Sequence, residues 1–235
     1  MSWLDRLLDL LFPPKCCFCG RLQERSGICP ACEKTLPRTG EEAEQTLEGG
    51  LRCASALWYE GEVRSGLLRF KFRGARWEAK DLGALLAETA AEVYSGEFDT
   101  VTWTPVSKKR RRERGYDQAE LLARSACRLW DTEPVRLLEK VIHNPAQSGL
   151  GDASARRANV LGVYDAANVD NITGKRILLV DDICTTGATL SECARVLLDA
   201  GATDVMAVTV ARGRKKSGEA QTCGGNTQEN GTNCR

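Results

Sequence analysis

Residues 177–190 read Ile-Leu-Leu-Val-Asp-Asp-Ile-Cys-Thr-Thr-Gly-Ala-Thr-Leu. The four branched apolar residues that open this stretch indicate a strand covered on both faces, as strands of parallel sheets are. From Leu190 onward apolar residues recur at helical spacing until Gly201, which predicts a helix. The stretch therefore predicts an α/β fold in which the loop Asp181–Thr189 follows the carboxyl end of a strand, where open α/β sheets bind ligands.

This loop joins two acidic residues to a hydroxyl-rich turn. A helix start offers unpaired backbone N–H groups and the positive end of the helix dipole, which suit a phosphate. Asp181 and Asp182 would repel a phosphate, but they suit hydroxyl groups or a hard cation such as Mg²⁺. A sugar phosphate suits both parts of the loop, with its hydroxyls at the acidic pair and its phosphate at the turn. The alternative is that the acidic pair only ends a strand and the threonines only cap a helix. The hydroxyl donors and the glycine that allows close backbone approach are Thr185, Thr186, Thr189 and Gly187.

Two C-x-x-C pairs near the N-terminus predict a metal site. Thiols in the cytosol stay reduced, so this spacing favours metal over disulfides, and four thiolates make a closed tetrahedral Zn²⁺ site of structural type. Cys17 offers a competing register, but only one residue separates it from the next cysteine. A redox pair and an iron–sulfur cluster are the alternatives. The expected Zn²⁺ ligands are Cys16, Cys19, Cys29 and Cys32.

Composition is that of a globular protein: 235 residues, 42% hydrophobic and 28% charged, with a formal net charge of +1. Such a charge gives no support to a general nucleic-acid binder, although a local patch could act. The first apolar run is broken by Asp5, Arg6 and Asp9, so it is neither a transmembrane helix nor a secretory signal. We expect a cytoplasmic protein.

Three regions are expected along the chain. Residues 1–50 form the zinc-binding domain, 51–212 the α/β domain, and 213–235 a disordered tail rich in Gly, Asn, Thr and Lys. Within the α/β domain the strand 100–106 is followed by a basic loop, residues 108–118. Such a run is a solvated face, a mobile lid over polyanions, or a contact for nucleic-acid phosphates.

The stretch 177–190 resembles the phosphoribosyl-pyrophosphate loop of type I phosphoribosyltransferases at every position of that pattern. The resemblance implies a parallel sheet flanked by helices. It also implies that Asp181 and Asp182 are the catalytic residues and hold the ribose 2- and 3-hydroxyls. The residues implied to hold the 5-phosphate are Thr185, Thr186, Gly187 and Thr189.

A wider resemblance joins the cysteine pairs, this loop and the run Arg-Glu-Arg-Gly-Tyr-Asp-Gln-Ala-Glu-Leu-Leu-Ala at residues 112–123. Together they resemble the ComF family, which comprises competence protein F and GntX-like relatives, with an N-terminal double-zinc-ribbon-like segment. A further family-like stretch spans residues 140–162. Asp117 stands where the family usually has Asn, which questions hydrogen-bond donation to a ligand, and Lys140 stands where it usually has Arg.

The resemblance implies binding of phosphoribosyl pyrophosphate with Mg²⁺, and transfer of the phosphoribosyl group to an unknown acceptor. Two alternatives stay open: a regulator that senses the ligand without turnover, and a non-catalytic competence protein. The second would bind single-stranded DNA, or a DNA-processing or competence-machinery protein, through the basic loop and the zinc module. The residues expected to bind pyrophosphate are Lys108, Arg112 and Arg114, with Lys71 a weaker candidate.

Overall fold

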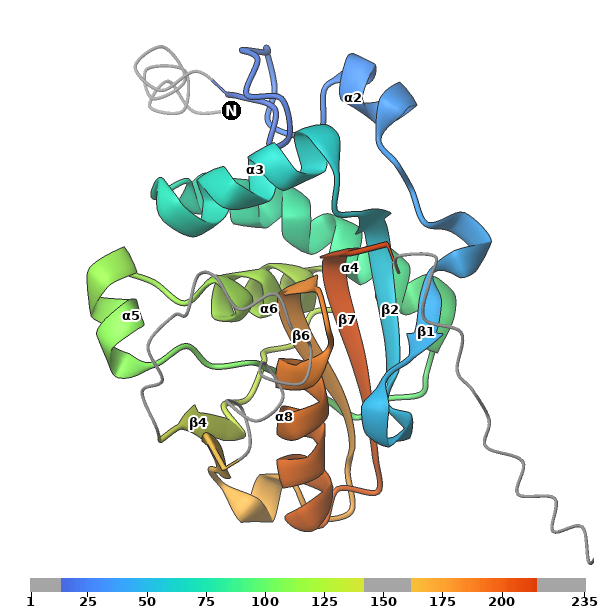
Figure 1. Ribbon diagram of the computed structural model, residues 1–235, viewed down its shortest axis with the longest axis vertical. Coiled ribbons are helices and arrows are strands. Elements are labelled where there is room, and N and C mark those ends of the chain that lie inside the picture. The colour runs from blue at the N-terminus through green and yellow to red at the C-terminus, as the bar shows by residue number, and fades with distance from the viewer. Residues whose placement is uncertain (1–13, 142–161, 215–235) are drawn as a thin grey trace, which may run out of the picture.

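A five-stranded sheet forms the centre of the molecule (Figure 1). The computed structural model describes residues 14–141 and 162–214. The strand order is β1-β2-β7-β6-β3, with β1 antiparallel at one edge and the other strands parallel. Two further strands, β4 and β5, form a small antiparallel sheet. The strands are β1 (Glu44–Thr46), β2 (Arg52–Trp58), β3 (Thr100–Trp103), β4 (Leu138–Lys140), β5 (Tyr164–Ala166), β6 (Arg176–Cys184) and β7 (Asp204–Arg212).

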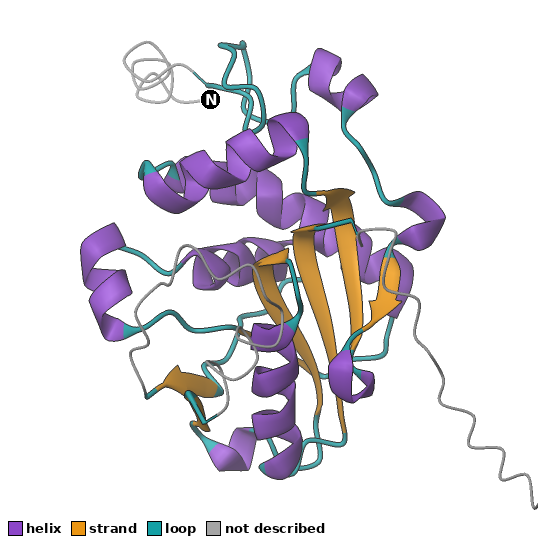
Figure 2. Ribbon diagram, viewed as in Figure 1, coloured by secondary structure: helices purple, strands orange, loops and turns teal. Residues whose placement is uncertain are grey.

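Helices cover both faces of the central sheet (Figure 2). α4 and α6 pack on one face and α8 on the other, while α3 crosses above the carboxyl ends of the strands (Figure 1). α5 lies beside that same end of the sheet. The helices are α2 (Pro30–Thr35), α3 (Gly61–Phe72), α4 (Ala79–Tyr94), α5 (Lys108–Arg114), α6 (Gln118–Leu129) and α8 (Ala188–Asp199).

The apolar run of β6 explains why the sheet needs two covering layers. Successive side chains of a strand point to opposite faces. Leu178 and Val180 accordingly join the core under α4 and α6, while Ile177 and Leu179 join the core under α8, and all four are fully buried. Each such side chain contributes about 1.5–3 kcal/mol when it is removed from water. The predicted α/β fold, with a parallel sheet flanked by helices, is confirmed.

Two local expectations are wrong. The strand does not end at residue 180, because β6 continues to Cys184 and pairs with β7 as far as Arg212. Asp181 and Asp182 therefore lie within the strand rather than in the loop Asp181–Thr189. Pairing with a neighbouring strand fixes their backbone, so their side chains are held more rigidly than loop residues would be.

The expected basic loop 108–118 is instead the helix α5, followed directly by α6. Ser107 caps its start by accepting a hydrogen bond from the Arg110 N–H, and Gly115 ends it in the left-handed conformation at φ 77°. The run of like charges favoured a loop in the sequence, although Ser107 and Gly115 are typical residues for the two ends of a helix.

The domain boundary expected at residue 50 stays a prediction, although β1, from within residues 1–50, is part of the central sheet. Almost all of the tail 213–235 and most of the stretch 140–162 lie outside the described residues. Within residues 14–141 and 162–214, no helix combines the length and apolar character needed to span a bilayer.

Candidate functional site

The two adjacent carboxylates of β6 lie next to a lysine from α3. Lys71 Nζ is 3.0 Å from Oδ2 and 3.1 Å from Oδ1 of Asp182, which is only 6% exposed. The Asp182 N–H donates to Asp181 Oδ1 at 2.8 Å. Burial raises the pKa of Asp181 to about 7, and the Asp182 carboxylate adds to that rise while Lys71 opposes it. The end of β6 thus concentrates negative charge, which the Lys71 ammonium group compensates in part.

Lys71 was expected, as a weaker candidate, to bind pyrophosphate, but the structure places it on Asp182. Burial lowers its pKa, yet the charges of Asp182 and Asp181 outweigh that effect, so the pKa is raised and the ammonium form is favoured. No local sequence signal marks this pair, because residues 71 and 182 meet only when α3 crosses the end of β6.

The threonine turn after β6 is only partly directed at the same space. Thr185 and Thr189 line a pocket with the two carboxylates, whereas Thr186 accepts a hydrogen bond from the Ala188 N–H at 3.5 Å and is exposed. Gly187 precedes α8 in the left-handed conformation at φ 78°, and a Cβ there would come within 2.9 Å of the Leu47 side chain. A glycine is needed for both reasons.

One face of α5 supplies guanidinium groups to this pocket. Arg110 and Arg114, four residues apart, line it, whereas Lys108 and Arg112 are exposed and are not among its lining residues. Burial and the nearby charge of Arg110 lower the pKa of Arg114, whose Nη1 donates to Gln118 Oε1 at 3.0 Å. Arg110 is not among the residues predicted to bind pyrophosphate. Its i, i+4 spacing from Arg114 places the two on one face only if the segment is a helix.

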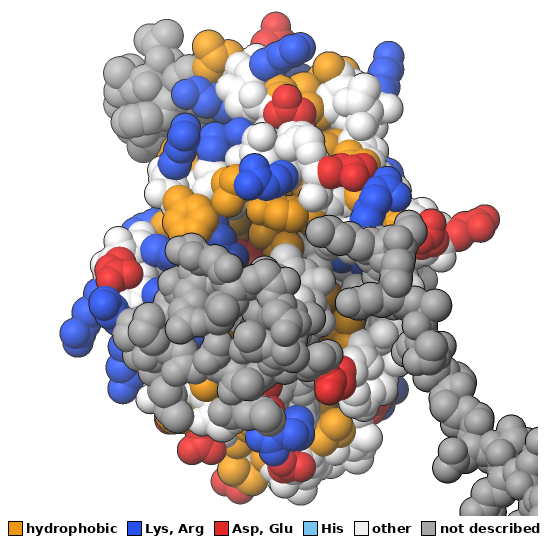
Figure 3. Space-filling view, in the orientation of Figure 1, with side chains coloured by type: hydrophobic (Ala, Val, Ile, Leu, Met, Phe, Trp, Pro, Cys, Tyr) orange, Lys and Arg blue, Asp and Glu red, His pale blue; other side chains and the backbone are white. Residues whose placement is uncertain are grey.

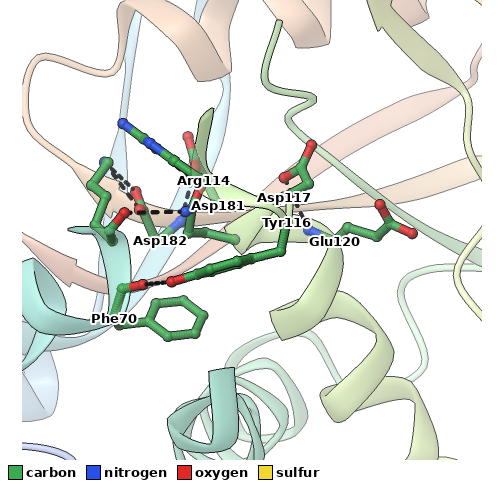
Figure 4. A network of polar contacts seen from close by, with 9 residues as sticks. Phe70, Arg114, Tyr116, Asp117, Glu120, Asp181 and Asp182 are labelled. Carbon is green, nitrogen blue, oxygen red and sulfur yellow. Dashed lines mark hydrogen bonds and ion pairs between the residues drawn. The ribbon is translucent and has the colours of Figure 1, made fainter. Parts of the chain in front are cut away.

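The junction between α5 and α6 is tied to α3. The Tyr116 hydroxyl donates to the Phe70 carbonyl oxygen (Figure 4). Gln118 Nε2 donates to the Lys71 carbonyl oxygen at 3.3 Å. Asp117 accepts from the backbone N–H groups of Val106 at 2.9 Å and Glu120 at 3.3 Å. An aspartate therefore serves here as a buried acceptor and helix cap, a role that requires no donated hydrogen bond.

A half-buried cation from β4 also lines the pocket. Lys140 Nζ, from β4, donates to the Tyr164 hydroxyl on β5 at 3.2 Å. Burial, together with the charge of Arg110, lowers the pKa of Lys140. The pocket has a volume of about 400 Å³, within the range of small-molecule sites. Its polar lining includes two carboxylates, two threonines of the turn after β6 and four cations: Asp181, Asp182, Thr185, Thr189, Lys71, Arg110, Arg114 and Lys140.

The second cluster is made by the four cysteines of the predicted metal site. The Sγ atoms of Cys16, Cys19, Cys29 and Cys32 lie within 4.8 Å of one another, and Cys17 is not part of the cluster. The N–H groups of Cys29 and Cys32 donate to the Sγ atoms of Cys16 and Cys29, each at 3.4 Å. Hydrogen bonds of this kind stabilise thiolates. The donor set and its closed geometry support a structural Zn²⁺.

The cysteine segment packs directly on α3. Arg69 Nη2 donates to the carbonyl oxygens of Cys17 and Phe18, each at 2.9 Å, and its Nε is 3.6 Å from Oε1 of buried Glu78. Gly66 allows this approach, because a Cβ there would lie 2.4 Å from the Cys17 carbonyl oxygen. The helix that supplies Lys71 is therefore braced by the cysteine segment.

Known proteins resemble both the part of the chain with the cysteine cluster and the part with the pocket. A phosphoribosyl transferase domain model matches residues 113–229 and a double zinc ribbon domain model matches residues 7–43. Competence protein ComFC of Bacillus subtilis is 32% identical over 84% of this chain and 77% of its own length. Competence protein F of Haemophilus influenzae is 28% identical over 80% of this chain and 91% of its own length. The DNA utilization protein YhgH of Escherichia coli K12 is 29% identical over 46% of this chain and 46% of its own length.

Replacing Cys29 with Ser tests the metal site. We expect purified wild-type protein to hold close to one zinc per chain and C29S to hold much less, because loss of one thiolate opens the tetrahedral site. Elemental analysis measures both. Cys17→Ser is the matched control and should retain zinc, since Cys17 lies outside the cluster. Equal zinc in wild type and C29S would contradict the assignment.

Replacing Asp181 with Asn tests the charge at the end of β6. The folded-state pKa of Asp181 lies near 7, above that of an unfolded aspartate at about 3.9, so this group destabilises the fold increasingly as the pH rises from about 4 to 7, and in full above pH 7. The penalty fades as the pH falls through 7 and the carboxyl group takes up a proton. D181N should therefore melt at higher temperature than wild type at pH 8.5, and at the same temperature near pH 4.

Thermal melts in Mg²⁺-free buffer measure this difference. Asp170→Asn, at an exposed aspartate, is the control and should leave the melting temperature unchanged at both pH values. A D181N variant that is less stable than wild type at pH 8.5 would mean that the Asp181 charge is well compensated.

Proposed function

Because the chain belongs to the family of the competence proteins ComFC and F, we propose that it binds phosphoribosyl pyrophosphate with Mg²⁺ and transfers the phosphoribosyl group. The observation that carries the proposal is the shared pocket, which is lined by Asp181 and Asp182, by the threonine turn and by the guanidinium groups of α5. A ribose bearing phosphates at both ends needs this set of groups, because carboxylates accept from its hydroxyls while hydroxyl and guanidinium donors bind its phosphates.

The chemistry follows from the charge distribution. As the C1–pyrophosphate bond loosens, positive charge develops on the ribose ring and negative charge on the leaving pyrophosphate. Asp181 and Asp182 accept hydrogen bonds from the ribose hydroxyls and favour the positive ring. Arg110 and Arg114 stabilise the departing anion, so α5 takes the role predicted for its basic residues, with Arg110 in place of Lys108 and Arg112.

The carboxylate oxygens of Asp181 and Asp182 match the ligands that Mg²⁺ prefers. Bound there with the substrate, the ion would neutralise phosphate charge. Lys71 competes for the same oxygens of Asp182, since its ammonium lies about 3 Å from both. We infer that the Lys71 ammonium stabilises the two buried carboxylates while the pocket holds no ligand, and that binding of ribose or Mg²⁺ displaces it.

The zinc segment has a structural role in this proposal. Its four cysteines leave no open coordination position for chemistry. Its contact with Gly66 and Arg69 instead holds α3 above the end of β6, which keeps Lys71 at the pocket.

DNA contact is the second candidate function, favoured by the outward face of α5. Lys108, Lys109 and Arg112 are exposed there and do not line the pocket, so phosphates can reach them from solvent, although Lys109 lies 4.0 Å from Glu113 Oε1. The names of the relatives refer to competence and DNA utilization. One helix would then serve two ligands, a sugar phosphate on its inner face and nucleic acid on its outer face.

Replacing Asp181 and Asp182 together with Asn tests the central proposal. The double variant keeps side-chain size but loses two anionic acceptors, each worth about 1.5–3 kcal/mol, so affinity for phosphoribosyl pyrophosphate should fall at least about tenfold. Inorganic phosphate, which needs only the threonine turn, should bind equally well or slightly better. Calorimetric titrations measure both affinities. Unaltered phosphoribosyl-pyrophosphate binding in a folded double variant would overturn the proposal.

Two double variants of α5 separate its inner and outer faces. R110A/R114A should weaken phosphoribosyl-pyrophosphate binding at least about tenfold, because two charged donors leave the pocket. K108A/R112A should leave that affinity within about twofold, but should weaken single-stranded DNA binding and flatten its salt dependence. Parallel titrations with both ligands check this. Equal effects of the two variants on either ligand would contradict the division into faces.

A further inference from the structure

A groove follows the exposed side of α3 and reaches the pocket lined by Asp181, Asp182 and the threonine turn, which we call the phosphoribosyl pocket. Its lining residues recur at helical spacing, so they share one side of the helix. Phe72, at the end of this row, is 62% exposed. On the face seen in Figure 3, hydrophobic side chains lie among Lys and Arg side chains along α3. The groove has a volume of about 420 Å³ and is lined by Ser65, Leu68, Arg69, Phe72 and Arg73.

The groove joins the phosphoribosyl pocket through apolar residues alone. Leu68 and Phe72 line both cavities, whereas Arg69 and Arg73 line only the groove. A third cavity, of about 610 Å³, joins the phosphoribosyl pocket through Phe72 and three cations, Lys71, Arg110 and Arg114. This cavity and the groove have only Phe72 in common, so the Phe72 side chain separates two extensions of different chemistry.

The two extensions suit different parts of a transfer reaction. A leaving pyrophosphate needs cations next to the ribose, which the extension with Arg110 and Arg114 supplies. An acceptor must approach the ribose carbon from another direction, with its ring held in one orientation. Leu68 and Phe72 offer an apolar wall beside the ribose site, and one side of the Phe72 ring is already covered by Arg114, whose guanidinium is 4.9 Å from the ring centroid.

We propose that the groove on α3 is the acceptor site, and that it takes a planar aromatic molecule bearing a carboxylate or phosphate. This proposal rests on the proposed transferase function. The acceptor ring stacks on Phe72 and its anionic group lies toward Arg73. A lone pair on its nucleophilic nitrogen or oxygen forms the bond to C1 as the bond to pyrophosphate breaks. The bonding electrons leave with pyrophosphate, and the proton of the nucleophile passes to solvent.

Arg73 is the cation best suited to the anionic group. Arg69 is half-buried and already donates to the carbonyl oxygens of Cys17 and Phe18. Arg73 is exposed at the C-terminus of α3, and within the described part of the chain its guanidinium forms no ion pair. A guanidinium in that position can bind either a carboxylate or a phosphate in a bidentate manner.

Calorimetric titration with two matched pairs of probes tests the site. The charged members are 2-aminobenzoate and phenyl phosphate, neither of which carries a ribose, and the uncharged members are 2-aminobenzamide and phenol. At least one charged probe should bind wild type more tightly than its uncharged partner. Phe72→Ala should weaken that probe at least about fivefold, as loss of a stacking ring does, and Phe72→Trp should retain it. Which charged probe binds distinguishes carboxylate from phosphate.

Arg73→Ala separates the anion contact from stacking. It should weaken the charged probe about tenfold or more and leave the uncharged probe unchanged, because only the charged group meets the guanidinium. Arg64→Ala, on α3 but outside the groove, is the matched control and should change neither. Failure of every probe to bind wild type at millimolar concentration, or wild-type binding by both F72A and R73A, would overturn the proposal.

Titration of wild type with phosphoribosyl pyrophosphate alone keeps the two proposals apart. Binding of this ligand without any probe would leave the transferase proposal standing and remove the acceptor site. Probe binding that depends on Phe72 and Arg73, in a protein that does not bind phosphoribosyl pyrophosphate, would overturn the transferase function and with it the groove's role as an acceptor site.

Discussion

The ion pair between Lys71 and Asp182 is the contact on which the rest of the site depends. It joins α3, which crosses above the sheet, to β6 at the centre of the sheet. Two adjacent carboxylates in a buried strand are unfavourable without a nearby cation, and removing one partner of such a pair is costly. The position of α3 therefore sets both the charge balance of the pocket and the place where the groove meets it.

The N-terminal segment acts on the site through the same helix. Its backbone carbonyl groups bind Arg69, and Gly66 lets the chain approach α3 closely. Short segments of this kind gain folding free energy from a bound metal, so a closed cysteine site can stabilise the wall of a pocket without any role in chemistry. The cysteine segment, which contacts α3 at Gly66 and Arg69, is thus connected through this helix to the carboxylates of β6, which contact it at Lys71.

The helix α5 places some of its basic residues at the pocket and leaves others exposed to solvent. A loop would leave all of them equivalent, whereas a helix directs Arg110 and Arg114 inward and leaves Lys108 and Arg112 exposed. The orientation of α5 is fixed by hydrogen bonds to the backbone of α3, from Tyr116 (Figure 4) and from Gln118. The inner guanidinium groups therefore meet the pocket, while the outer charges remain available to a larger polyanion.

The sequence by itself determined the α/β class, the acid pair, the threonine turn and the four cysteines, because each is a local pattern with a direct physical meaning. It did not determine the length of β6 or the helical state of residues 108–114, since pairing with β7 and a cap at each end outweighed local composition. Only the tertiary structure decided that Lys71 meets Asp182 and that Arg110 reaches the pocket. Both contacts join residues distant in sequence, and they exist only once α3 and α5 have packed at the end of the sheet.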